Sequence, residues 1–259
     1  MLLAIDCGNT NIVFAIYDGD EKCASWRISS DSRRSTDEYT VWLTQLMALK
    51  NINVDQIKGV MIASVVPDIS PKLVALARHG FDLMPLCVDD PDVDLGIAIN
   101  IDSPEQAGAD RVVNAVAAAA WHNLPAIVID FGTATTLDLI GPKGAYEGGI
   151  IAPGVNLSID ALHMAAARLP RLAVKPWQPD MPVLGTDTIS AMQSGVFWGY
   201  VGMVEGLLER LRHSYGEDLP AIATGGLAPL FADHINGPLI VDADLTLKGL
   251  VRIYAQNKI

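Results

Sequence analysis

Basic side chains are scarce in this chain of 259 residues. It has 18 lysine and arginine residues against 30 aspartate and glutamate residues, and its formal net charge is −12 at pH 7. A protein that binds the phosphate backbone of a nucleic acid needs a basic surface. The composition therefore argues against a nucleic-acid partner. It still allows a small anionic ligand held by backbone N–H groups, a metal ion and one or two local cations.

Cysteine is also rare, and long apolar runs are missing. Cys7, Cys23 and Cys87 form no Cys-x-x-Cys pair, so we expect reduced thiols, as in a cytoplasmic protein. Cys7 is expected to be a small buried residue and not a nucleophile. No stretch of about 18 or more uncharged apolar residues predicts a membrane span, and we find no signal-peptide pattern. The chain is therefore predicted to be cytoplasmic, with no membrane partner.

Hydrophobic residues are abundant, at 50% against 19% charged residues, which predicts a large buried core. Strand and helix patterns alternate along the first half of the chain, and this alternation is typical of a layered α/β fold. Strands are expected at about residues 2–7, 11–17, 22–28, 58–66 and 83–88, and helices at 36–50 and 71–79. The polar segment 31–37, with Arg33 and Arg34, is either a solvated loop or a lid that contacts a nucleotide.

A short polar turn, Asp6 to Asn11, joins two apolar runs of strand length and predicts a β-hairpin. A carboxylate, a glycine and small polar side chains are what a cradle for phosphate and Mg²⁺ requires. The same residue types are also ordinary turn residues, so the turn alone is a weak signal.

A second copy of this pattern strengthens the signal. Residues 126–139 repeat the pattern of residues 2–15, with Asp130 in the place of Asp6 and Gly132 in the place of Gly8. The repeat predicts two similar α/β domains, residues 1–116 and 117–259, with the last helix free to pack back across the boundary. We expect a cleft between the domains, where the two turns grip a polyphosphate.

The segment between the two copies is predicted to carry a working carboxylate. Ser103, followed by proline and then Gln106, forms a capping-box pattern, so a helix is expected to start there and to run to Trp121. Asp110 and Asn114 lie one turn apart on this helix. The alternative is that Asp110 and its neighbour Arg111 form a structural pair.

The C-terminal half shows three further patterns. A helix is expected from Pro153-Gly154 to near Arg168, followed by a proline-rich loop over residues 170–182. The longest helical pattern covers 186–213, and its glycines indicate either a dimer interface or tight packing within the chain. A strand at 219–223 leads into Thr224-Gly225-Gly226, an arrangement suited to a nucleotide.

With these residues in hand, the chain resembles the type III pantothenate kinases of the acetate and sugar kinase/Hsp70/actin-like superfamily, whose domains are ribonuclease H-like. Asp6-x-Gly8-Asn9-Thr10-Asn11 and Asp130-x-Gly132-Thr133-Ala134-Thr135 are similar to the two phosphate motifs of that family. Gly108-Ala109-Asp110-Arg111 is similar to its pantothenate motif. Glu147-Gly148-Gly149, Thr224-Gly225-Gly226 and Leu245-Thr246-Leu247-x-Gly249-Leu250 follow in family order.

The resemblance implies a homodimer that phosphorylates pantothenate with ATP, the first step of coenzyme A biosynthesis, using Mg²⁺ and K⁺ or NH₄⁺. It implies that Asp110 is the general base, that Asp130 holds the monovalent cation and that Asp6 lies near Mg²⁺. The implied ATP-binding residues are Asp6, Cys7, Gly8, Asn9, Thr10, Asn11, Ile12, Val13, Thr133 and Gly225. The implied pantothenate-binding residues are Ile101, Gly108, Ala109, Asp110, Arg111 and Thr188.

Two positions depart from the family pattern. Ile101 stands where the family often has tyrosine, and Thr186 follows Gly185 where a basic residue is common. Both departures concern the substrate pocket. Two alternatives to the predicted enzyme stay open: a kinase for a sugar or another carboxylate on the same scaffold, and a non-catalytic ATP-binding accessory protein.

Overall fold

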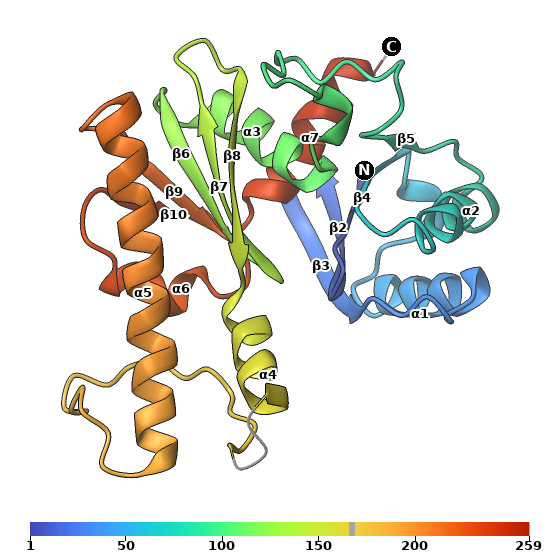
Figure 1. Cartoon of the computed structure of the whole chain (residues 1–259). Helices are drawn as coiled ribbons and strands as arrows, with labels where there is room; N and C mark the ends of the chain where they lie inside the picture. The colour runs from blue at the N-terminus through green and yellow to red at the C-terminus, as the bar shows by residue number, and fades with distance from the viewer. Residues whose placement is uncertain (166–168, 259) are drawn as a thin grey trace. The chain divides into compact units, whose positions relative to one another are not determined.

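The computed structural model describes residues 1–165 and 169–258, which form two α/β units (Figure 1). The first unit comprises residues 1–122, residues 144–146 and the chain from Asp244 onward, and the second comprises residues 123–143 and 147–243. The predicted boundary between residues 116 and 117 would fall inside helix α3, which runs from Ala109 to Trp121.

The first unit is a five-stranded mixed sheet between two pairs of helices. The strand order is β3-β2-β1-β4-β5. Its strands are β1 (Leu2–Cys7), β2 (Asn11–Asp18), β3 (Glu21–Ser29), β4 (Gly59–Ser64) and β5 (Leu86–Cys87), and its helices are α1 (Thr36–Ala48), α2 (Ser70–Phe81), α3 (Ala109–Trp121) and α7 (Leu245–Asn257).

The alternation of side chains along β1 explains why both faces of this sheet are covered. Leu3 and Ile5 belong to one buried cluster with residues of α1 and α2. Leu2 and Ala4 point to the opposite face and belong to a second cluster with residues of α3 and α7. A strand that is apolar at every position therefore requires helices on both sides.

The second unit has its own five-stranded sheet, in the order β10-β9-β6-β7-β8. Its core joins Ile127, Ile129 and Phe131 of β6 to residues of α4, α5 and α6. Its strands are β6 (Ala126–Phe131), β7 (Ala134–Ile140), β8 (Tyr146–Pro153), β9 (Ala221–Thr224) and β10 (Leu239–Val241), and its helices are α4 (Val155–Ala165), α5 (Thr188–Tyr215) and α6 (Ala228–Phe231).

The two sheets have the same topology, as the repeat predicts. In each, the first strand of a hairpin also pairs in parallel with a later strand: β1 with β4, and β6 with β9. The copies differ in loop length, because Cys7 pairs with Ile12 whereas Phe131 pairs with Thr135. The second hairpin loop is therefore one residue shorter than the first.

The predicted helix start at Ser103 is wrong. Residues 104–106 form only a short 3-10 turn, and the Ser103 side chain makes no capping hydrogen bond. Ala107 is extended, and α3 begins at Ala109 after Gly108. The residues of the capping pattern form a turn and not the first turn of a longer helix. The turn ends after Gln106, where the N–H of Ala107 donates to the carbonyl of Pro104.

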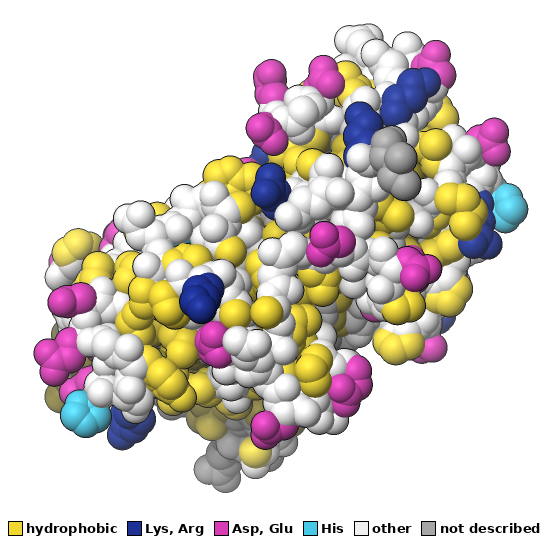
Figure 2. Space-filling view, turned by 90° about the horizontal axis from the view of Figure 1, so that it is seen from above, with side chains coloured by type: hydrophobic (Ala, Val, Ile, Leu, Met, Phe, Trp, Pro, Cys, Tyr) yellow, Lys and Arg dark blue, Asp and Glu magenta, His cyan; other side chains and the backbone are white. Residues whose placement is uncertain are grey.

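Other predicted elements differ less. The strand expected at 83–88 is reduced to the two residues of β5. The helix after Gly154 begins as predicted, while its predicted end near Arg168 lies outside the described residues. Among the described residues, no helix is long and apolar enough to cross a membrane. Figure 2 shows one face of the molecule, on which lysine and arginine side chains are scattered, as the low basic content leads one to expect.

Candidate functional site

The first predicted phosphate turn is an exposed loop with a well-defined backbone. The N–H of Gly8 donates to the carbonyl of Asn11 at 3.0 Å, while Asn9, Thr10 and Asn11 are exposed. The start of the turn is fixed by β1, on which the half-buried Asp6 lies opposite Val13 of β2. The turn therefore presents small polar groups next to one carboxylate.

Three residues predicted at this turn lie beneath it. Cys7 and Ile12 are 1% and 0% exposed, and Val13 is half-buried, so the side chains of Cys7 and Ile12 belong to the core and only their backbones are available to a ligand. Burial raises the pKa of the Cys7 thiol to about 11. The prediction that Cys7 is a small buried residue is confirmed.

The predicted base lies at the start of α3. Asp110 is half-buried, and its Oδ1 accepts a hydrogen bond from the N–H of Arg111 at 2.8 Å. A negative side chain is favourable in the first turn of a helix. The preceding Gly108 leaves room for this carboxylate, because a Cβ at Gly108 would lie 2.6 Å from Asp110 Oδ1. The family motif Gly-Ala-Asp-Arg is thus also a compact helix start.

Arg111 is oriented by an aromatic ring that the sequence analysis did not assign. Its Cζ lies 5.6 Å from the centroid of the Tyr146 ring, a cation–π distance. Tyr146 also pairs with the segment leading to Ile101, since the Tyr146 N–H donates to Ala98 and its carbonyl accepts from Asn100. Ile101 is half-buried. Tyr146 is 1% exposed, so it supports this part of the site from below.

The second predicted turn is packed closely around Asp130. Asp130 lies opposite Thr224 of β9, and Gly225 follows with a φ of 89°. A Cβ at Gly225 would lie 2.5 Å from Asp130 Oδ1 and 2.7 Å from the carbonyl oxygen of Phe131. Only glycine fits this conformation and this spacing. Oxygen ligands are what a hard cation prefers, so this carboxylate and carbonyl fit the predicted monovalent cation.

A further glycine that the sequence analysis did not assign shapes the second turn. A Cβ at Gly154 would lie 2.2 Å from the carbonyl oxygen of Thr133 and 2.7 Å from that of Gly132. The start of α4 therefore lies directly against this turn, whose residues Gly132 and Thr133 are exposed. Nearby, the hydroxyls of Thr135 and Tyr200 share a hydrogen bond of 2.5 Å, which joins the hairpin to α5.

Thr188, the predicted pantothenate residue of the second unit, is the exposed first residue of α5. Asp187 caps this helix, because its Oδ1 accepts from the N–H groups of Ile189 at 2.9 Å and Ser190 at 3.1 Å. The Ser190 hydroxyl, which donates to Asp187 Oδ2 at 2.7 Å, lowers the pKa of Asp187 most, and these backbone bonds add to the effect. Gly185 passes so close to the first turn of α5 that a Cβ there would lie 2.2 Å from the nitrogen of Ala191. Asp187 and Gly185 shape the start of α5, so threonine at position 186 in place of the basic residue common in the family does not disturb it.

The glycines of α5 do not pack against another element of the described chain. A Cβ placed at Gly195, Gly199 or Gly202 would meet nothing within 4 Å, so the interpretation as tight packing within the chain is wrong. Gly195 and Gly199 instead line a groove of about 720 Å³ between α4 and α5, together with Thr188, Leu162 and Met203.

The predicted residues are distributed over the two units. The first unit carries Asp6, the turn that follows it, Ile101 and the segment Gly108 to Arg111; the second carries Asp130, Thr133, Thr188 and Gly225. Two residues that support the site, Tyr146 and Gly154, could have been found in the sequence only from weak signals. Tyr146 lies just before the glycine pair at 148–149, and Gly154 directly follows a proline.

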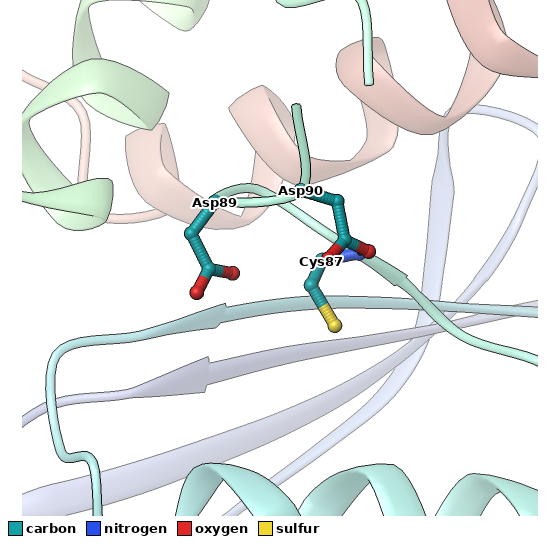
Figure 3. Close-up of side chains that lie close together, drawn as sticks. All are labelled: Cys87, Asp89 and Asp90. Atoms are coloured by element: carbon teal, nitrogen blue, oxygen red, sulfur yellow. The ribbon is translucent and has the colours of Figure 1, made fainter. Parts of the chain in front are cut away.

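A separate cluster lies at the end of β5 (Figure 3): Cys87 is the last residue of the strand, Asp89 and Asp90 follow it, and their potential ligand atoms lie within 4.8 Å of one another. Burial, with both carboxylates adding to it, raises the pKa of the Cys87 thiol to about 11. The thiol is thus protonated at neutral pH in the absence of a metal ion, and ligation would require it to lose this proton. The cluster contains neither Asp6 nor Asp130, the predicted metal residues.

Comparison with known proteins gives a consistent result. A model of the type III pantothenate kinase family matches residues 2–210. A type III pantothenate kinase from Paramagnetospirillum magneticum is 55% identical over 99% of this chain and 98% of its own length. One from Rhodospirillum rubrum is 51% identical over 100% of this chain and 99% of its own length.

Solved structures support the fold. A putative N-acetylmannosamine kinase from Listeria monocytogenes has a TM-score of 0.56 at 12% identity, covering 100% of this chain and 99% of that one. A putative Baf family transcriptional activator from Campylobacter jejuni has a TM-score of 0.61 at 18% identity, covering 98% of both chains. At these identities the likeness shows the fold alone.

Proposed function

Because this chain belongs to the type III pantothenate kinase family, we propose that it phosphorylates pantothenate at its primary hydroxyl with ATP, the first step of coenzyme A biosynthesis. The observation that carries the proposal is the match to curated pantothenate kinases at about half identity over nearly the whole chain. The exposed first turn and the half-buried Asp110 supply the groups that the reaction requires.

The proposed reaction needs positioning, charge neutralisation and one base. Asp110 accepts the proton of the pantothenate hydroxyl, and the freed oxygen forms a bond to the γ-phosphorus of ATP. The bond from that phosphorus to the β–γ bridging oxygen breaks, and ADP leaves with the electron pair. The first turn, from Asp6 to Asn11, holds the phosphates through backbone N–H and small polar groups, and Thr133 and Gly225 contribute from the second turn.

Pantothenate is proposed to lie against the start of α3 and the start of α5. Arg111, stacked on Tyr146, is oriented to bind the substrate, and Thr188 contributes a hydroxyl. Gly108 and Ala109 allow the substrate to approach the backbone, and Ile101 offers an apolar contact in place of the tyrosine common in the family.

Two cations are proposed to complete the site. Mg²⁺ near Asp6 would neutralise the phosphate charge, and one carboxylate plus phosphate oxygens is a usual Mg²⁺ environment. K⁺ or NH₄⁺ would be held by Asp130 and the neighbouring carbonyl of Phe131. All three cysteines are free thiols, which supports the cytoplasmic location.

The groove between α4 and α5 supports a homodimer. Its glycines are open, and Leu162 and Met164 of α4 and Ile189 of α5 are 37%, 77% and 48% exposed. Small residues let two helices approach closely, so a second copy of α5 is the proposed occupant. Thr188 lines the same groove, and dimerisation would therefore complete the pantothenate site.

The direct test is ADP release by purified protein that depends on pantothenate, with a sugar panel as the control for substrate class. Phosphopantothenate as the product supports the proposal. A protein that binds ATP but releases no ADP with pantothenate would instead be the non-catalytic accessory protein, and turnover with a sugar alone would identify another kinase.

A further inference from the structure

The segment between β3 and α1 is joined directly to the first phosphate turn. The N–H of Ser30 donates to the carbonyl of Thr10 at 2.9 Å, and the hydroxyl of Ser30 donates to the carbonyl of Gly8 at 2.5 Å. Both acceptors belong to the turn between β1 and β2. Residues 30–35 therefore begin at the edge of the proposed nucleotide site, within the same unit.

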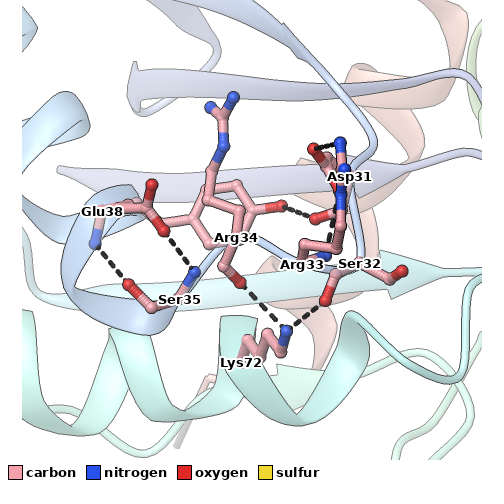
Figure 4. A network of polar contacts seen from close by, with 8 residues as sticks. Asp31, Ser32, Arg33, Arg34, Ser35, Glu38 and Lys72 are labelled. Carbon is pink, nitrogen blue, oxygen red and sulfur yellow. Dashed lines mark hydrogen bonds and ion pairs between the residues drawn. The ribbon is translucent and has the colours of Figure 1, made fainter.

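The far end of this segment is fixed as well (Figure 4). Lys72 Nζ of α2 donates to the carbonyl of Ser32 at 2.5 Å and to that of Arg34 at 3.0 Å. The Ser35 N–H donates to the Glu38 carboxylate at 2.7 Å, and the Glu38 N–H donates back to the Ser35 hydroxyl at 3.2 Å. Both ends and the middle of the segment are therefore hydrogen-bonded to neighbouring elements, and residues 30–35 form a wall next to the turn.

The two adjacent arginines of this wall differ in their surroundings. Arg33 is 88% exposed in its side chain and binds the Asp31 carboxylate through Nε and Nη2, each at 3.0 Å. This pairing holds the pKa of Asp31 at about 2. Arg34 is half-buried. Among the described residues its guanidinium forms no ion pair with a carboxylate, although its charge helps to lower the pKa values of Asp31 and Glu38. Figure 4 shows its side chain pointing away from Asp31 and Glu38.

An aromatic ring holds Arg34 in place. Its Cζ lies 5.6 Å from the centroid of Tyr39, and Tyr39 is fully buried, with its hydroxyl donating to the carbonyl of Asp31. Tyr39 belongs to the same core cluster as Cys7 and Ile12, the residues beneath the turn. The pKa of Tyr39 is raised by its burial and is affected by the charges of Arg34 and Cys7. The ring therefore holds the guanidinium over the core cluster that also contains the residues beneath the turn.

A half-buried guanidinium that lies over an aromatic ring, in a segment hydrogen-bonded through Ser30 to the proposed phosphate turn, is suited to phosphate, which it can bind with two parallel hydrogen bonds. In a chain of net charge −12, with Asp6 at the turn itself, such a local cation offsets repulsion of a polyphosphate. We propose that Arg34 is a nucleotide-binding residue whose guanidinium contacts the phosphate chain of the ATP held at the turn from Asp6 to Asn11. This inference rests on the proposed function.

The test compares Arg34→Gln with Arg33→Gln, a matched control that removes the neighbouring, carboxylate-paired guanidinium. Loss of a charged hydrogen bond predicts a roughly ten- to hundredfold rise in the KM for ATP and in the Kd for ADP in Arg34→Gln. The KM for pantothenate and the melting temperature should stay near wild type. Arg33→Gln should resemble wild type in all these measurements. Arg34→Lys keeps the charge but lacks the paired planar donors of the guanidinium, so its KM for ATP and its Kd for ADP should lie between those of wild type and Arg34→Gln.

Three outcomes would overturn the inference: a KM for ATP within about twofold of wild type in Arg34→Gln, an equal effect in both glutamine variants, or a rise confined to the KM for pantothenate. If Arg34→Gln fails to fold, Arg34→Lys provides the comparison. Failure of the proposed function is a separate result. Wild-type protein would then form no phosphopantothenate, while ADP binding would still depend on Arg34.

Discussion

The carboxylate of Asp110 occupies the first turn of α3 and has one described bond, to the adjacent N–H of Arg111 at 2.8 Å. Asp110→Asn keeps the shape and a hydrogen-bond acceptor but cannot take up the substrate proton. We expect kcat to fall roughly 10²–10⁴-fold while ADP binding and the melting temperature stay unchanged. Asp102→Asn, at an exposed carboxylate on the preceding loop, is the control. Turnover within a few-fold of wild type in Asp110→Asn would exclude Asp110 as the base.

Gly225 is a position where one methyl group should disturb a cation site. In Gly225→Ala the new Cβ would meet Asp130 and the Phe131 backbone, and the positive φ would be strained, so we expect a loss of stability above about 1 kcal/mol. We also expect loss of the stimulation of activity by K⁺ over Na⁺. Gly19→Ala is the control, because it has a φ of 60° but nothing within 4 Å of its Cβ. Unchanged K⁺ dependence in Gly225→Ala would count against cation binding at Asp130.

Buried Cys7 should be inert and its protonation should favour folding. Its pKa is raised from 9.0 to about 11, so the stabilising effect of the neutral thiol is complete below pH 9 and is lost as pH rises from 9 to 11. At pH 8, iodoacetamide should modify exposed Cys23 and leave Cys7 unmodified, as read by mass spectrometry of the folded protein. Equal labelling of the two cysteines would show that the turn opens.

At the scale of elements, the contact between α3 and α7 explains the C-terminal motif. The Thr246 hydroxyl donates to Asn114 Oδ1 at 2.7 Å, and a Cβ at Gly249 would lie 2.2 Å from the carbonyl oxygen of Val113. The motif Leu-Thr-Leu-x-Gly-Leu is therefore a helix-packing motif. Asn114, predicted on the same helix face as Asp110, serves this contact.

Gly249→Ala should force these two helices apart and destabilise the first unit by about 1–3 kcal/mol. Arg252→Ala, at an exposed position of α7 itself, is the control. It should leave the free energy of unfolding within about 0.5 kcal/mol of wild type. Urea unfolding of both variants measures the difference. Equal midpoints would contradict the close approach of α3 and α7.

Sequence patterns predicted most elements, and the failures have local causes. The capping pattern at Ser103 belongs to a turn of three residues. The residue types do not show that Ala107 then adopts an extended backbone before α3 begins. The strand expected at 83–88 shrinks to Leu86–Cys87 because it pairs only with part of β4. Contacts formed by distant segments, such as Tyr146 beneath Arg111 and Gly154 against Thr133, required the structure.

At the scale of the whole molecule, the open face of α5 predicts the oligomeric state. Gly199→Glu places a charge in the groove between α4 and α5 and should shift the protein from dimer to monomer in light scattering, with the KM for pantothenate rising. Glu209→Arg, at an exposed position on the same helix outside the groove lining, should remain dimeric. A wild-type monomer with full activity would contradict the proposed dimer.

The repeat predicted the duplicated architecture because a hairpin with Asp-x-Gly at its turn recurs at an offset of 124 residues. The strand orders confirm it: β3-β2-β1-β4-β5 of the first sheet corresponds strand by strand to β8-β7-β6-β9-β10 of the second. It did not predict that the second loop is one residue shorter, since the two turns align through Asp and Gly and diverge only afterwards. The Asp6 and Asp130 turns therefore occupy corresponding positions in the two units but differ in backbone.

The return of α7 to the first unit has a consequence for synthesis on the ribosome. Leu250 and Ile253 of α7 are buried in one cluster with Leu2 and Ala4 of β1, although about 250 residues separate them in the chain. The face of the first sheet that α3 and α7 cover therefore stays incomplete during synthesis until α7, which follows the second unit in the chain, is made. The second unit, made entirely in between, has all its strands available earlier. The second unit can therefore be completed before the first, whose β1–β4 face is covered only in part, by α3, until α7 is made.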